Sequence, residues 1–374
     1  MKILIVMGGF FPGKKYGGPP VSIDNFCSLM KEYACYIVTH NHDLFETEKY
    51  SNIDDGWNDR GNCKVLYLSD SEYNKRTFEK VMEEIKPDVL YMQGLFQSCV
   101  FPCLQLAKKR HLKVLLAPRG ELCAGALHLK KQKKVPYIYL IKALGLTRNL
   151  HFQSTSEEET EAIKKWLKVS DDKIHMLDNI PSIPSKEYPR RVKQAGEGRF
   201  VFLSRIHPKK NLLSAIRYFH TVQGQVIFDI YGPIEDEAYW QECEEEIKKL
   251  PDHIHVKYCG LVSHEQVHEV FSRYDAFLFP TLSENYGHVI AEAMISCCPI
   301  IISRGTTPWD DVDQNGGYTI PLTENAMWTK GIQQLVDMSS EAYAEFCDQL
   351  ACYIDFKLDI SQLKTDYEAM FFAM

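Results

Sequence analysis

The sequence predicts an α/β protein with two doubly wound domains, each built on a mostly parallel sheet. Three observations carry this prediction: the length of 374 residues, the alternation of short apolar runs with helical stretches, and a proline-rich break at 178–199. A single hydrophobic core rarely grows beyond ~250–300 residues, so a chain of this length is expected to split. We therefore expect two domains.

The first half alternates strand-like and helix-like segments. Because parallel neighbouring strands need a crossover that a helix supplies, this order predicts βαβ units and one N-terminal domain over 1–178. Apolar, β-branched runs lie at 2–7, 35–39, 64–68, 88–92, 113–117 and 150–154, and helical spacing recurs at 21–33, 72–86, 97–110 and 156–167.

The segment DNIPSIPSKEYPRRVKQAGEGR at 178–199 has neither a helical nor a strand period and is the expected linker. Alternation then resumes, which predicts a second domain over 179–355. We expect the last helix, 356–374, to leave that domain and pack on the first. Two such domains would form a cleft, with ligands at the carboxyl ends of the strands. Strands are expected at 199–204, 225–232, 253–260, 275–280, 299–303 and 317–320.

The composition argues against several classes of function. With 43 basic and 50 acidic residues the net charge is −7, which is atypical of nucleic-acid-binding domains. The 12 cysteines lack zinc-knuckle spacing and sit mostly in apolar stretches, which favours buried thiols in a reducing compartment. No apolar run approaches the ~18 residues of a membrane span, and no cleavage site follows the apolar start. We therefore expect a cytoplasmic protein.

The stretch LSENYGHVIAEAM at 282–294 places two carboxylates in a strand-to-helix loop of the second domain. The backbone amides of Asn285, Tyr286 and Gly287 are expected to open the helix, where unpaired donors attract a phosphate. Glu284 and Glu292 flank these amides and could accept hydrogen bonds from ligand hydroxyls. The alternative is that both glutamates are ordinary surface residues.

A second loop supplies positive charge at the same edge. SRIHPKKN at 204–211 follows a predicted strand and carries Arg205 and Lys210. Arginine offers a bidentate fork for phosphate and lysine a mobile point charge. Together they could neutralise a leaving diphosphate without a metal. The alternative is a basic loop that only solvates the edge of the sheet.

These segments resemble a known family. SENYGHVIAE, SRIHPKK, the glycine loop around Gly17 and Gly18, and APRGELCAGALHLKKQKK at 117–134 are similar to retaining glycosyltransferases of family four, especially those that build capsule and antigen polysaccharides. The resemblance implies the GT-B fold of two facing Rossmann-like domains. It also implies transfer of a sugar from a nucleotide-diphospho-sugar to a glycan or lipid-linked acceptor, with retained configuration, no metal and no cofactor.

The resemblance also assigns roles to the residues above. Glu292 would hold the ribose hydroxyls and Glu284 the hydroxyls of the donor sugar, with the amides of 285–287 near the sugar and phosphate. Arg205 and Lys210 would stabilise the departing diphosphate. Rate would then come mainly from electrostatic stabilisation of the leaving group and from orientation of the acceptor.

The chain departs from the family at two positions. Asn285 stands where relatives often have glycine, and Arg119 where many have histidine. A guanidinium cannot act as a base near neutral pH, so we interpret Arg119 as a phosphate or acceptor contact. The alternative is a structural arginine paired with Glu121. By the same resemblance Gly17 and Gly18 would close over the diphosphate.

Two histidine patterns could suggest metals. HEQVH at 264–268 matches a zinc-protease pattern, but it lacks the third histidine and falls on a short predicted helix, so we reject it. His40 and His42 could ligate a metal, although exposed loop imidazoles are the commoner interpretation. The expected site therefore contains no metal.

The segment 128–146 combines lysines with apolar residues as a basic amphipathic stretch. It predicts either peripheral contact with the inner membrane surface or a helix whose lysines are solvated. For the whole protein, two alternatives to a transferase stay open: a nucleotide-sugar epimerase of the same fold, and a silent nucleotide-binding subunit. The donor base, the donor sugar and the acceptor are not legible in the sequence.

Overall fold

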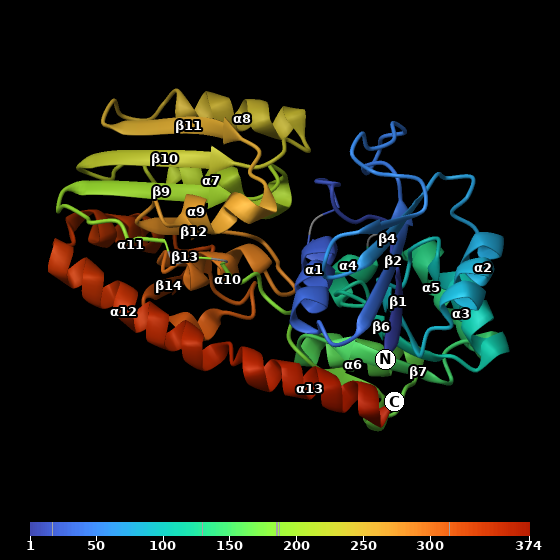
Figure 1. Cartoon of the computed structure of the whole chain (residues 1–374). Helices are drawn as coiled ribbons and strands as arrows, with labels where there is room; N and C mark the ends of the chain where they lie inside the picture. The colour runs from blue at the N-terminus through green and yellow to red at the C-terminus, as the bar shows by residue number, and fades with distance from the viewer. Residues whose placement is uncertain (17, 129, 185, 187, 314) are drawn as a thin grey trace. The chain divides into compact units, whose positions relative to one another are not determined.

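The computed structural model of the chain contains two compact units (Figure 1). It describes residues 1–16, 18–128, 130–184, 186, 188–313 and 315–374. The first unit comprises 1–180 and 360–374, and the second comprises 181–359. Within the described residues, no helix combines the length and the apolar character required to cross a lipid bilayer.

The first unit is built on an eight-stranded sheet in the order β3-β4-β2-β1-β5-β6-β7-β8. All neighbouring strands are parallel except β3 and β4. Each strand predicted for this unit occurs within one residue of its expected bounds, while the three-residue strands β3 and β8 are additional. The strands are β1 (Lys2–Val6), β2 (Ala34–His40), β3 (Trp57–Asp59), β4 (Lys64–Leu68), β5 (Val89–Gln93), β6 (Lys113–Ala117), β7 (Leu150–Ser154) and β8 (Ile174–Met176).

Helices connect these strands and several begin at side-chain caps. Asn74 caps α2 by accepting from the Thr77 amide at 3.2 Å, and Ser156 caps α6 by accepting from the Glu159 amide at 3.2 Å. Such caps satisfy amide groups that have no partner inside the helix. The helices are α1 (Gly18–Leu29), α2 (Lys75–Ile85), α3 (Val100–Arg110), α4 (Ala124–His128), α5 (Lys131–Ala143) and α6 (Glu157–Leu167).

The C-terminal helix α13 (Ile360–Ala373) belongs to the first unit. Its buried Tyr367 hydroxyl accepts from Gln153 Nε2 at 2.7 Å and donates to the Asp178 carbonyl at 3.0 Å. The Phe371 ring packs against Phe26, with centroids 5.9 Å apart. The helix is therefore held on the first unit by aromatic burial and by a hydrogen-bond pair that reaches β7.

The second unit has a six-stranded parallel sheet in the order β11-β10-β9-β12-β13-β14. Strands β12 and β13 are buried along their whole length, and so is the apolar run 200–202 of β9, as expected for strands covered on both faces. The strands are β9 (Glu197–Leu203), β10 (Gln225–Tyr231), β11 (Ile254–Gly260), β12 (Ala276–Phe279), β13 (Ile300–Ser303) and β14 (Gly317–Ile320). The helices are α7 (Leu212–Arg217), α8 (Glu237–Ile247), α9 (Val267–Phe271), α10 (His288–Ile295), α11 (Asn325–Asp337) and α12 (Ser340–Lys357).

The expected linker at 178–199 is in part anchored to the second unit. Lys193 is buried, and its ammonium donates to the carbonyls of Glu197 at 2.8 Å and Val336 at 2.9 Å. Arg191 forms an ion pair with the fully buried Asp275. Buried charges need partners, so these contacts fix the segment just before β9. Its polar residues are structural, which a search for regular periods does not reveal.

We predict that Tyr367→Phe lowers the free energy of unfolding by about 1–3 kcal/mol, because it leaves the Gln153 amide and the Asp178 carbonyl without their shared buried partner. Chemical denaturation of the full chain measures the effect. Phe372→Ala, on the same helix but with its residue 83% exposed, is the control and should change stability by less than about 0.5 kcal/mol. Equal effects in the two variants would contradict this account of α13.

Candidate active site at the carboxyl edge of the second sheet

Three loops meet where adjacent strands β9, β12 and β13 end. The amide of Leu282, after β12, donates to the carbonyl of Lys209, after β9, at 2.9 Å. The amide of Glu284 donates to the carbonyl of Thr306, after β13, at 2.7 Å. The loop that carries the candidate glutamate is thus held by backbone hydrogen bonds on both sides.

Lys210 and Glu284 form an ion pair at this edge. Their side chains are only 10% and 14% exposed. Glu284 also accepts from the Thr281 hydroxyl at 3.0 Å, and the Lys210 ammonium lies 5.6 Å from the centroid of the Phe279 ring. Burial lowers the pKa of Lys210, while the charge of Glu284 opposes that shift. The structure therefore brings together one predicted cation and one predicted carboxylate in a largely water-free setting.

Arg205 does not share this environment. Its guanidinium donates to Glu235 at 2.7 Å, and both side chains are partly exposed. Sequence reasoning missed Glu235. The close approach of their two loops depends on Gly232, whose φ is 132° and whose added Cβ would lie 1.9 Å from the Ser204 carbonyl oxygen. The Tyr-Gly pair that ends β10 is the signal that could have indicated this approach.

The helix after the loop begins later than expected. Asn285 and Tyr286 precede α10, which begins at His288 with Gly287 as its N-cap at φ 76°. A side chain at Gly287 would be strained in this conformation and would press on Ile290. The predicted amides therefore lie in the turn that leads into the helix.

Tyr286 is buried and is held by a residue that sequence reasoning missed. The Trp309 indole donates to the Tyr286 carbonyl at 2.6 Å, and the two rings pack edge to face with centroids 5.3 Å apart. Trp309 lies in the loop after β13. This contact is a further connection between the neighbouring loops of the edge.

Glu292 is buried in α10, at 4% exposure, and burial raises its pKa to about 7. Its Oε1 lies 3.8 Å from His264 Nδ1. His264 belongs to the HEQVH pattern, yet α9 begins only at Val267, and His268 Nδ1 instead lies 2.8 Å from the Ser296 hydroxyl. The two histidines therefore do not share the single helix that the zinc-protease pattern requires.

In the first unit, Gly18 begins α1, and Gly17 lies outside the described residues. Arg119 has a left-handed φ of 57° and donates to Gln93 at 2.8 Å. It also donates to Asn179 and to the Tyr91 hydroxyl, the latter at 3.3 Å. Its guanidinium is thus engaged with internal polar groups of the first unit.

The suggested pairing of Arg119 with Glu121 is wrong. Glu121 instead accepts from the amides of Leu95 at 2.5 Å and Phe96 at 3.2 Å, in the loop after β5. The two side chains are near in sequence, but the turn at 118–123 directs each to a different set of partners. Nearness in sequence therefore pointed to the wrong partner for Arg119.

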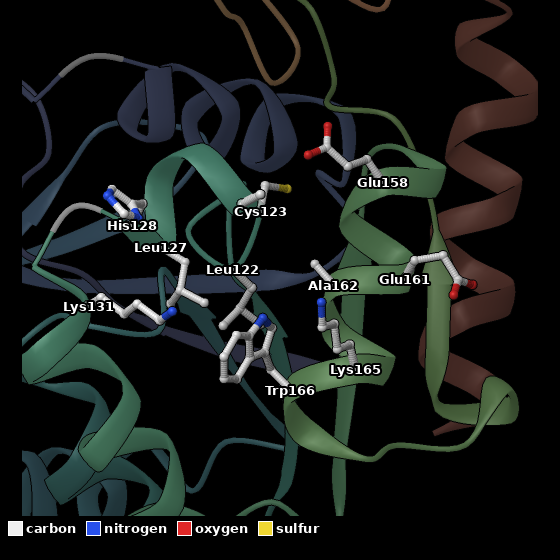
Figure 2. Close-up of a pocket in the computed structure, with 11 residues that line it drawn as sticks. Leu122, Cys123, Leu127, His128, Lys131, Glu158, Glu161, Ala162, Lys165 and Trp166 are labelled. Atoms are coloured by element: carbon white, nitrogen blue, oxygen red, sulfur yellow. The ribbon is translucent and has the colours of Figure 1, made fainter.

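A pocket of about 470 Å³ lies in the first unit between the segment 122–131 and α6 (Figure 2). Leu122, Leu127 and Trp166 contribute apolar surface to it, and the charged Glu158, Glu161 and Lys165 of α6 also line it. Among the described residues that the sequence predicted for the site, none lines this pocket.

Comparison with known proteins gives matches in sequence and in structure. Residues 185–350 match the family described as Glycosyl transferases group 1. A protein from the cps region of Klebsiella pneumoniae is 24% identical over 60% of this chain and 62% of its own length. The O-antigen chain mannosyltransferase B of Escherichia coli is 24% identical over 43% of this chain and 44% of its own length. This chain thus spans less than two thirds of these relatives.

Solved structures match over the whole chain at low identity. The Anabaena HepE protein in complex with UDP and glucose has a TM-score of 0.74 at 12% identity, covering 100% of both chains. Sucrose-phosphate synthase from Thermosynechococcus elongatus has a TM-score of 0.71 at 13% identity, also over 100% of both. These likenesses establish the fold. Residues 185–350, fewer than half of the chain, match the glycosyl transferases group 1 family, and the two sheet-based units have the GT-B fold.

Proposed function

We propose that this protein is a retaining glycosyltransferase that moves a sugar from a nucleotide-diphospho-sugar to a glycan or lipid-linked acceptor in polysaccharide biosynthesis. The observation that carries the proposal is the buried Lys210–Glu284 pair at the carboxyl edge of a sheet within the matched family region. Relatives named for O-antigen mannosyl transfer support the acceptor class, and a similar fold solved with UDP and glucose supports the donor class.

The leaving diphosphate would be stabilised by protein cations and amides without a metal. Lys210 lies in a buried setting, where a charge interaction is stronger than in water. Arg205 is on the loop just before it and would exchange Glu235 for phosphate oxygens, to which its planar fork is suited. The turn at 285–287, ahead of α10, would place backbone donors near the sugar and phosphate.

The two glutamates would recognise hydroxyl groups. Glu284 stands beside Lys210 and would accept from the donor sugar once the lysine turns to phosphate. Glu292 is buried in the second turn of α10. Its carboxylate would accept hydrogen bonds from the ribose hydroxyls. A carboxylate suits two neighbouring hydroxyl groups, because each of its oxygens can accept a separate hydrogen bond.

The first unit would bind the acceptor. By this proposal Gly18 and Arg119 contribute contacts to phosphate or acceptor groups, as the resemblance implies. In the described part of 128–146, Tyr139, Leu140 and Leu144 are exposed beside several lysines, while Ile138 and Ile141 are buried. The exposed set supports peripheral contact with an anionic membrane surface, which suits a lipid-linked acceptor.

The test is turnover with a panel of nucleotide sugars, after a thermal-shift screen has selected the nucleotides that bind. Release of nucleoside diphosphate that requires an acceptor supports transfer, and NMR of the product's anomeric proton tests retention. Full turnover in excess chelator tests metal independence. An isomerised sugar nucleotide without acceptor would instead indicate an epimerase. Binding without turnover across the panel would indicate a silent subunit.

We predict that Glu292→Ala weakens binding of the selected nucleoside diphosphate about 10- to 100-fold, the loss expected for hydrogen bonds to a charged acceptor. Isothermal titration calorimetry measures it. Glu245→Ala removes an exposed glutamate of α8 that pairs with nearby Lys248, and it should leave affinity unchanged. Equal affinity for both variants would remove Glu292 from the nucleotide site.

We predict that Lys210→Met lowers kcat about 10²- to 10³-fold, because the departing diphosphate loses a pre-positioned cation. Assays are run well below the variant's unfolding temperature. Lys209→Met is the matched control, since Lys209 is the exposed neighbour in the same loop and should retain near-normal kcat. A kcat within a factor of about two of the wild type in Lys210→Met would refute this role.

The same lysine gives a prediction about stability. Lys210→Met leaves the Glu284 carboxylate buried without its partner and should cost about 3–5 kcal/mol of unfolding free energy. Adding Glu284→Gln removes the unpaired charge, so the double variant should regain most of that loss. Denaturant titration of the wild type, both single variants and the double variant measures the coupling. Additive effects would mean that the two side chains do not interact.

The buried carboxyl of Glu292 predicts a pH dependence. Its ordinary pKa is 4.5 and burial raises it to about 7, so the folded state holds the proton more tightly than the unfolded state. The contribution of Glu292 to the free energy of unfolding is therefore fully present below about pH 4.5 and is lost as the pH rises through 7. Glu292→Gln should be more stable than wild type by about 3 kcal/mol above pH 7, with little difference near pH 4. A pH-independent difference in denaturation midpoints would contradict this.

A further inference from the structure

Two histidines and one aspartate of the first unit converge at the carboxyl edge of its sheet. His40 ends β2, His42 follows in the next loop, and Asp70 follows β4. Strands β2 and β4 are adjacent and parallel, with His40 opposite Leu68. The topology therefore places both post-strand loops side by side, although about 30 residues of sequence separate them.

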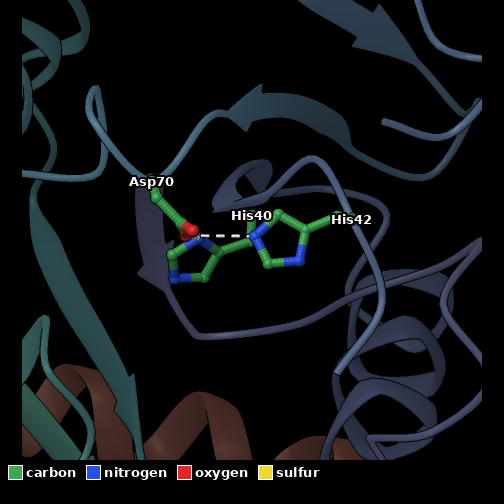
Figure 3. Close-up of side chains that lie close together, drawn as sticks. All are labelled: His40, His42 and Asp70. Carbon is green, nitrogen blue, oxygen red and sulfur yellow. Dashed lines mark hydrogen bonds and ion pairs between the residues drawn. The ribbon is translucent and has the colours of Figure 1, made fainter. Parts of the chain in front are cut away.

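The three side chains direct ligand atoms at one point. His40 Nδ1 and His42 Nε2 lie 3.1 and 3.0 Å from the same oxygen, Asp70 Oδ1 (Figure 3). One possible metal-ligand atom from each residue lies within 4.8 Å of the ligand atoms of the other two residues. The imidazoles are 17% and 12% exposed, so the sequence interpretation of exposed loop histidines is wrong. The His40 ring also packs on Tyr73, with centroids 3.9 Å apart, which fixes its orientation.

Either protons or a cation can join the two imidazoles to the Asp70 carboxylate. His42 Nδ1 lies 2.9 Å from the Asp43 carbonyl, which can only accept, so this nitrogen carries a hydrogen. In the neutral ring Nε2 then presents a lone pair to the Asp70 carboxylate. His40 Nδ1 is also buried and makes no well-aligned hydrogen bond within the described residues. The Nδ1–H tautomer of His40 and a doubly protonated His42 could each donate to Asp70 Oδ1, whereas a bound cation would accept a lone pair from each of the three atoms.

We propose that His40, His42 and Asp70 form a binding site for a divalent transition-metal ion of the Zn²⁺ type. Two imidazole nitrogens and one carboxylate oxygen are ligands that Zn²⁺ and Co²⁺ prefer, whereas Mg²⁺ and Ca²⁺ prefer oxygen alone. Tetrahedral ligands about 2.0–2.2 Å from zinc are separated by about 3.3–3.6 Å, so the two nitrogen–oxygen distances of 3.1 and 3.0 Å would lengthen by a few tenths of an ångström on binding. Asp70, at 69% side-chain exposure, leaves the outer side open to water as a fourth ligand.

Neighbouring groups support these ligands. The His42 ring donates its other N–H to a backbone carbonyl, which is the usual outer contact of a metal-bound histidine. Tyr16 donates to the His42 carbonyl at 3.0 Å, and the Asp43 carboxylate accepts from the amides of Lys14 at 2.8 Å and Lys15 at 3.1 Å. A bound ion would therefore brace the loop after β1, which leads into the glycine segment before α1. Its role would be to hold that loop and not to act on the diphosphate.

The test is metal titration of the tag-free full chain after removal of metals by chelator and dialysis. Co²⁺ is the spectroscopic probe and Zn²⁺ the competitor. We expect one tight ion per chain, with visible d–d absorption but no thiolate charge-transfer band, which separates this site from the cysteines. His42→Ala and Asp70→Asn should each weaken Co²⁺ binding by at least about tenfold. Zn²⁺ should raise the Tm of the wild type more than that of either variant.

His175→Ala is the matched control, because His175 Nε2 lies 3.0 Å from His151 Nδ1 in a second histidine pair that forms no ion pair with a carboxylate among the described residues. It should leave Co²⁺ binding unchanged. Asp70→Asn changes an exposed side chain and keeps the test valid if His42→Ala fails to fold. Absence of Co²⁺ binding, unchanged affinity in Asp70→Asn, or a thiolate band would overturn the proposal. Because the readout is binding, none of these results depends on transferase activity.

Discussion

The buried Lys210–Glu284 pair is the interaction on which the candidate site depends. Each charge would be costly alone in this setting, so each requires the other to stay buried. The backbone bonds from Leu282 to Lys209 and from Glu284 to Thr306 set the three loops in register, and this register brings the two side chains together. The Lys210–Glu284 ion pair therefore depends on the backbone hydrogen bonds that hold together the loops after β9, β12 and β13.

Two kinds of carboxyl group meet this edge, and their environments differ. Glu284 has an ammonium and a hydroxyl as partners, whereas Glu292 is buried in α10 and its pKa is raised to about 7 by burial. Near neutral pH, Glu292 can therefore exist in either protonation state at small cost. A ligand hydroxyl that donates to it would favour the ionised form. Under the proposed function, nucleotide binding would be linked to proton release from this group.

Much of the architecture followed from the sequence, and the misses have physical causes. Strand positions were predictable because buried parallel strands are short apolar runs between helices, as at 113–117 and 150–154. The short strands β3 and β8 carry too few residues to show a period. The segment before β9 looked like a free linker because Lys193 and Arg191 are polar, and their buried partners come from residues distant in sequence.

The site was predictable in its residue types but not in its pairing. The candidate cations and carboxylates were predicted because strand-to-helix loops meet at one sheet edge. Which cation meets which carboxylate depends on side-chain direction, and so Glu235 as the partner of Arg205 and Trp309 as the support of Tyr286 were missed. The same limit applies to His40 and His42, since only the register of β2 against β4 brings Asp70 to them.

The ion pair also bears on which ligands the edge can select. A ligand that recruits Lys210 must replace Glu284 as its partner, and it must then supply Glu284 with new donors. A neutral sugar supplies hydroxyl donors but no anion, while a free phosphate supplies an anion but few donors. A sugar joined to a diphosphate offers both at adjacent positions, so it alone among these three compensates both halves of the pair. Under the proposed function, Lys210 and Glu284 would exchange each other for ligand groups, and this exchange would favour the intact nucleotide sugar over the free sugar or the free phosphate.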